Sequence, residues 1–134
     1  MKKYVIDGIE IKDFRSMACA FADAVNAPDG YFGTDIPSFD DCFFGYVHFE
    51  KPCEFIWKDA HIARNALDCK QLEQHWLAFT ECEFYGEHAK AMVQAARQGK
   101  QTLFEDVVSF IRSVGVRNIH HRVLLTLEIG KITP

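Results

Sequence analysis

The residues best suited to act on another molecule are gathered between Pro28 and Glu54. This stretch has six acids and a single base, Lys51, whereas the rest of the chain has 13 acids and 14 bases. The acids are Asp29, Asp35, Asp40, Asp41, Glu50 and Glu54. The same stretch holds seven of the 18 aromatic residues. A segment that is both acidic and aromatic favours a basic protein as partner and argues against nucleic acid.

Histidines and cysteines between positions 61 and 88 are the main candidates for metal binding. They are His61, Cys69, His75, Cys82 and His88. Zinc needs four ligands that converge on one tetrahedral site, and the spacing of these residues matches no zinc-finger or ribbon pattern. A helical segment would also spread their side chains over several faces. We therefore expect neither a metal site nor any other bound cofactor.

Other arrangements that support catalysis are also missing. His120 and His121 precede a strand, which sends neighbouring side chains to opposite faces. Asp40 and Asp41 are adjacent on a predicted helix and point about 100° apart, which does not suit shared acid–base work. The sequence has no glycine-rich phosphate loop and no nucleophile elbow. We expect a protein that is not an enzyme.

The length and composition are those of one globular domain. The chain has 134 residues, of which 49% are hydrophobic and 25% charged. No apolar run approaches the ~20 residues that span a bilayer, and the first residues lack the features of a signal peptide. The five cysteines are odd in number and widely spaced, which is typical of free thiols in a reducing compartment. We expect a cytoplasmic protein without a membrane partner.

The elements that must position the acidic segment follow from the apolar pattern. Strands are expected at 3–6, 53–57 and 122–129, and the apolar run of the last one predicts a central strand covered on both faces. Asp13 is a suitable N-cap for a first helix, and a short second helix should start near Pro37. The pattern is helical from about 59 to 115, and the last helix should run from Thr102 to Gly115. This order predicts an α/β fold with a small three-stranded parallel sheet flanked by helices.

The segment 31–46 reads Tyr-Phe-Gly-Thr-Asp-Ile-Pro-Ser-Phe-Asp-Asp-Cys-Phe-Phe-Gly-Tyr and resembles the signature of the barstar family of ribonuclease inhibitors. Two aromatic residues and a glycine lead into a short acidic helix, and a glycine and an aromatic residue follow. The strands, the first helix and the last helix also agree with the family in kind and spacing, over about 3–58 and 101–130. The resemblance implies a single barstar-like domain over 1–134, with a helical insertion at about 59–100.

The resemblance also implies a site. In the family, this loop and second helix plug the active site of a ribonuclease, and an acid of the helix occupies the phosphate site. Asp41 corresponds to that acid by position, whereas Pro37 stands where the family has a second acid, whose role is then left to Asp40 or Asp35. The partner-binding residues so implied are Tyr31, Phe32, Gly33, Asp35, Asp40, Asp41, Phe44 and Tyr46.

The expected partner is a ribonuclease with a basic cleft, or an RNase toxin against which the chain acts as an immunity protein. The alternative is an interaction or immunity protein of the same fold whose partner is not a ribonuclease. The insertion at 59–100 is then either extra packing or a second contact surface. The free protein is expected to be a monomer.

Overall fold

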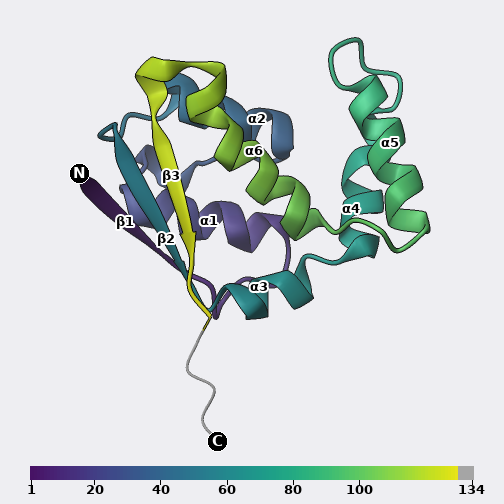
Figure 1. The fold of residues 1–134 in the computed structure, drawn as a ribbon, viewed down its shortest axis with the longest axis horizontal. Coiled ribbons are helices and arrows are strands. Elements are labelled where there is room, and N and C mark those ends of the chain that lie inside the picture. Colours follow the sequence, from purple (N-terminus) through teal and green to yellow (C-terminus); the bar gives the residue numbers. More distant parts are fainter. Residues whose placement is uncertain (130–134) are drawn as a thin grey trace, which may run out of the picture.

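The chain builds one small sheet with helices beside it (Figure 1). The computed structural model describes residues 1–129 of the 134. The elements in chain order are β1 (Lys2–Asp7), α1 (Phe14–Val25), η1 (Pro28–Gly30), α2 (Ile36–Asp41), η2 (Cys42–Tyr46), β2 (Cys53–Lys58), α3 (Ala60–Ala66), α4 (Cys69–Trp76), η3 (Leu77–Phe79), α5 (Gly86–Arg97), α6 (Leu103–Arg117), η4 (Ile119–His121) and β3 (Val123–Leu127). The strands form a wholly parallel sheet in the order β1-β2-β3. The predicted α/β class and three-stranded parallel sheet are confirmed.

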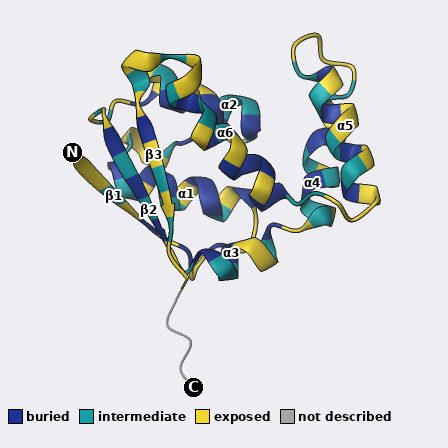
Figure 2. Cartoon of the chain, viewed as in Figure 1, coloured by how far each residue is buried: buried dark blue, intermediate teal, exposed yellow. Residues whose placement is uncertain are grey.

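Within residues 1–129, helices cover one face of the sheet and leave the other exposed. Its buried side chains are Ile6, Cys53, Phe55, Trp57 and Val123. The opposite face exposes Lys3, Val5, Asp7, Leu124 and Thr126, and it faces away from α1 and α6 in Figure 2. The prediction that the last strand is central and covered on both faces is wrong, because β2 pairs with both neighbours and β3 with β2 alone. Leu124 is accordingly 46% exposed.

The helices against the sheet start at caps that are present in the sequence. Asp13 accepts a hydrogen bond from the backbone N–H of Ser16 at 2.8 Å, which confirms the predicted start of α1. Thr102 caps α6 in the same way through the N–H of Glu105. Helix α6 ends at Arg117, two residues beyond the expected end, because Gly115 remains helical and lies against Arg122.

The segment 59–100 is helical and lies mostly beyond the helices of the sheet. Helix α3 lies near one end of the sheet, whereas α4 and α5 pack against each other on the far side of α6 (Figure 1). Leu72 and Trp76 of α4 are fully buried, so this pair of helices shares the core of the domain. No helix within residues 1–129 is both long enough and apolar enough to cross a membrane.

Candidate functional site

Helix α2 begins with a cap that its own sequence supplies. The carboxylate of Asp35 accepts hydrogen bonds from the N–H of Ser38 at 2.8 Å and from its hydroxyl at 2.7 Å. Pro37 lies in the first turn, where its missing N–H costs no helical hydrogen bond. The resemblance assigns Asp35 to partner binding, whereas in the structure its carboxylate caps the start of the helix. The sequence signal for this role was available, because Asp13 and Ser16 have the same spacing.

Gly33 brings the loop into contact with the helix. Its φ is +94°, and a Cβ built on it would lie 2.5 Å from the backbone N and Cα of Phe39. Only glycine combines this left-handed conformation with so close an approach. The loop that carries Tyr31 is therefore held directly against α2.

The two aromatic residues of the loop have opposite environments. Phe32 is 1% exposed and its ring lies 5.1–5.7 Å from three other phenylalanine rings, those of Phe21, Phe39 and Phe43. Its burial in this aromatic core stabilises the fold, so Phe32 offers almost no side-chain surface to a partner. Tyr31 is half-buried, and its ring lies 5.7 Å from that of Tyr46, which is 73% exposed.

The two adjacent acids of α2 are separated by the packing of the helix. Asp40 is buried, and its oxygens accept hydrogen bonds from Nη1 and Nη2 of Arg117 at 2.7 and 2.5 Å. Arg117 of α6 binds both of its oxygens, so the partner contact expected of Asp40 would require this ion pair to open. Asp41 is exposed.

Arg117 fixes the end of α2 through several contacts at once. Besides Asp40 it donates to the hydroxyl of Ser113 at 2.9 Å and to the carbonyl of Phe110 at 3.3 Å. Its guanidinium lies 4.7 Å from the ring centre of Phe44, which is within cation–π distance. The hydrogen bond to Asp40 raises the pKa of Arg117 above its ordinary value. Phe44 is thus half-buried, and its ring contacts the guanidinium of Arg117.

The single base of the acidic segment, Lys51, contacts groups other than Asp41. Nζ of Lys51 donates to the carbonyl of Phe43 at 2.5 Å and lies 3.0 Å from Nδ1 of His121. Burial lowers the pKa of Lys51. Lys51 and Asp41 therefore form no salt bridge with each other.

Tyr85 of the helical segment 59–100 is affected by the acids of α2. Burial raises the pKa of Tyr85, and the negative charges of Asp40 and Asp41 raise it further. Its ring lies 6.0 Å from that of Trp76. Sequence reasoning assigned neither Tyr85 nor Arg117 to this site, and no local motif marks them, since Arg117 is 77 positions from Asp40.

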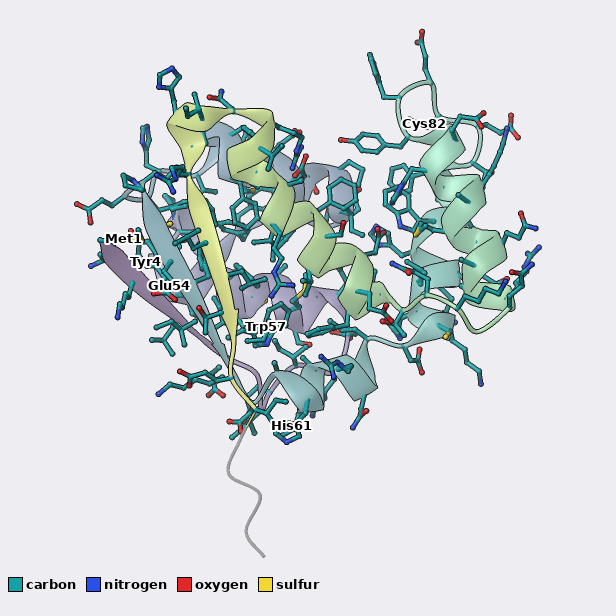
Figure 3. The ribbon with its side chains drawn as sticks, in the orientation of Figure 1. Met1, Tyr4, Glu54, Trp57, His61 and Cys82 are labelled. Carbon is teal, nitrogen blue, oxygen red and sulfur yellow. The ribbon has the colours of Figure 1, made fainter. Side chains whose placement is uncertain are left out.

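The candidate metal ligands are dispersed. Cys82 lies in the loop before α5 and His61 on α3, at opposite ends of the molecule in Figure 3. Within residues 1–129, no three His, Cys, Asp or Glu side chains form a group that could hold a metal ion. His75 and His88 instead make hydrogen bonds inside the fold. The thiols of all five cysteines are free.

Among the residues predicted to contact a partner, Asp41 and Tyr46 are exposed and Tyr31 and Phe44 are half-buried, and we call these four residues the α2 surface. It offers one carboxylate, which can accept two hydrogen bonds from a guanidinium, and aromatic rings that provide flat apolar area. Gly33, Asp35 and Asp40 hold this surface in shape from below. In comparisons with known proteins, no family model and no curated protein matches the chain.

Proposed function

We propose that this protein is a ribonuclease inhibitor of the barstar type, which places the α2 surface in the basic active site of a ribonuclease or an RNase toxin. The observation that carries the proposal is the exposed carboxylate of Asp41 on a helix that Arg117 fixes from behind through Asp40. The order of aromatic residues, glycine and acids in 31–46, which resembles the family's signature, supports the same conclusion.

The chemistry of inhibition follows from what a ribonuclease must bind. Its cleft holds a phosphodiester and stabilises additional negative charge in the transition state, so it is lined with cationic side chains. The carboxylate of Asp41 can take the place of a phosphate there and accept charge-assisted hydrogen bonds from arginine. Tyr46 and Tyr31 can lie where nucleobases would stack.

The internal contacts of α2 favour tight binding because they fix its shape before a partner arrives. A surface that is already ordered loses less conformational entropy on association than a mobile loop. Gly33 against Phe39, Asp35 at the helix start and the Asp40–Arg117 pair each restrict the position of the helix. Asp41 is presented on this fixed support.

One observation favours a second candidate, an interaction or immunity protein of the same fold that binds a partner other than a ribonuclease. Asp35 and Asp40 are engaged within the fold, so Asp41 is the exposed acid that remains on α2. A single carboxylate fits a smaller cationic pocket than the multiply charged cleft of a nuclease. The captured partner's ability to hydrolyse RNA separates the two candidates.

The test compares Asp41→Ala with a matched control. Asp23→Ala removes an exposed acid from α1, outside the α2 surface, with the same change in net charge. Each protein is immobilised and used to capture partners from the cell of origin, and the captured fraction is assayed for RNA cleavage with and without free wild-type chain. We expect Asp41→Ala to weaken binding about 10- to 100-fold, the loss of a charge-assisted contact, and Asp23→Ala to bind like wild type.

The stability of each variant is measured in parallel by thermal unfolding. Asp41 is exposed, so we expect its melting temperature to stay close to that of wild type. Undiminished binding by Asp41→Ala would overturn the assignment of the α2 surface. RNA hydrolysis by the purified chain itself would overturn the inhibitor proposal.

A further inference from the structure

The first turn of α2 donates one of its hydrogen bonds to a distant part of the chain. The N–H of Ile36 donates to Nε2 of His75 at 3.0 Å, across 39 positions of sequence. Pro37 has no N–H, and the N–H of Ser38 is bound by Asp35. The free donors that begin a helix are therefore satisfied, one of them by an imidazole of α4.

The position of His75 is determined by its surroundings. Its ring stacks on Phe14 with centroids 5.0 Å apart and on Phe79 at 6.0 Å. Because Nε2 accepts a hydrogen bond, the proton of the neutral ring is on Nδ1. A protonated imidazole would present a second N–H to the N–H of Ile36, and a positive charge to the positive end of the α2 dipole.

Helix α4, which carries His75, is itself tied to α6. The indole N–H of Trp76 donates to Oδ2 of Asp106 at 2.6 Å, and Nε2 of His88 lies 2.9 Å from Oδ1 of the same carboxylate. The Asp106 side chain is 3% exposed. His75 is thus anchored through its neighbour Trp76 to the same helix whose end binds Asp40.

We propose that His75 is a positioning residue, through which the helical segment 59–100 holds α2 and the Asp41 carboxylate in their binding orientation, and whose protonation releases this hold. The consequence for a partner rests on the proposed function. The hydrogen bond from Ile36 to His75, by which α4 holds α2, is a property of the free chain. Asp41 lies on the same short helix as Ile36, so a movement at the helix start is transmitted to the carboxylate.

The charges around His75 agree with a neutral ring at neutral pH. Burial lowers the pKa of His75 to about 4, against the opposing effect of Asp35 and Asp106. Asp13, the N-cap of α1, and Arg15 of α1 line the same surface hollow as His75 and bring one charge of each sign. The ring therefore gains its proton only as the pH approaches about 4.

Two variants separate the hydrogen bond from the packing. His75→Phe keeps an aromatic ring between Phe14 and Phe79 but has no acceptor, whereas His75→Gln keeps an acceptor near the position of Nε2. Amide hydrogen exchange of the free protein is measured by NMR, with the Ser38 amide as the internal control because Asp35 caps it locally.

We expect the protection of the Ile36 amide to fall about tenfold in His75→Phe and to be largely restored in His75→Gln, with little change at Ser38. In wild type, corrected for intrinsic exchange, Ile36 protection should decrease as the pH is lowered toward 4, and in His75→Gln it should not. Equal Ile36 protection in all three proteins would overturn the proposal. So would imidazole nitrogen shifts that place the proton on Nε2 at pH 7, a measurement that needs wild type only.

The consequence for binding is read with the ribonuclease that immobilised wild-type chain captures. His75→Phe should bind it about tenfold more weakly and His75→Gln nearly as well as wild type. If no ribonuclease is captured, the proposed function fails while the amide measurements still decide the hold on α2. If the amides behave as expected but both variants bind like wild type, the hold exists and its role in partner binding is refuted.

Discussion

Removal of the Arg117 guanidinium should expose how strongly the fold depends on the buried ion pair beneath the α2 surface. Arg117→Ala leaves the Asp40 carboxylate, whose side chain is 6% exposed, without its two hydrogen bonds. We expect a loss of about 3 kcal/mol in the free energy of unfolding, at the lower end of the cost of breaking a buried pair.

The magnitude follows from the geometry. Hydrogen bonds to charged groups contribute about 1.5–3 kcal/mol each, and Asp40 accepts two from Arg117. The Arg117 side chain is 38% exposed, so water screens part of this interaction, and the upper end of the summed energy of the two hydrogen bonds does not apply. The cation–π contact with Phe44 adds about 0.5–1 kcal/mol.

Urea unfolding at pH 7, followed by the fluorescence of the buried Trp57 and Trp76, measures the loss. The control is Arg112→Ala, which removes an exposed arginine from the same helix and should change stability by less than about 0.5 kcal/mol. Adding Asp40→Asn to Arg117→Ala should recover at least about 1 kcal/mol, because it removes the unpaired buried charge. If Arg117→Ala unfolds like Arg112→Ala, the pair contributes nothing and the argument for a fixed α2 is refuted.

Two further predictions concern the support of the α2 surface. Gly33→Ala should lower the free energy of unfolding by about 2–4 kcal/mol in the same urea assay, because the added Cβ would lie 2.5 Å from the Phe39 backbone. The control is Gly45→Ala, whose φ is +109° but whose Cβ would enter open space, and it should cost only about 1 kcal/mol. Equal losses in the two variants would contradict the close approach at Gly33. Because the pKa of His75 is depressed in the folded chain, His75 of the unfolded chain binds its proton at a higher pH than His75 of the folded chain, starting as the pH falls below 6.5. Stability should therefore decrease by about 3 kcal/mol between pH 6.5 and pH 4, a component that unfolding curves of His75→Gln should lack.

The candidate site shows why an acidic segment is an incomplete description of a binding surface. Asp40 and Asp41 are neighbours of the same residue type, yet one is enclosed by α6 and the other is exposed. Successive helical residues point about 100° apart, so when one faces the core the next faces its border or the solvent. The phase of the helix, which the partner helix α6 sets, determines which acid is available.

The sequence alone determined the features that depend on residues close together in the chain. The cap at Asp13 lies three positions from the group it binds, and the strands follow from short apolar runs. The α/β class, the three parallel strands and the helical nature of 59–100 could be read in this way. The concentration of acids and aromatic residues in 28–54 is likewise a property of composition.

Only the tertiary structure decided what each of those residues does. Phe32 is part of the core because rings from α1, α2 and η2 pack around it. Strand β3 is an edge strand because β2 lies between the other two, and Asp40 is bound by a guanidinium 77 positions away. His75 reaches the start of α2 across 39 positions. Pairings over such distances depend on how whole elements pack, and local patterns carry no information about that packing. Within this fold, packing buried Asp40 and left Asp41 as the exposed acid of α2.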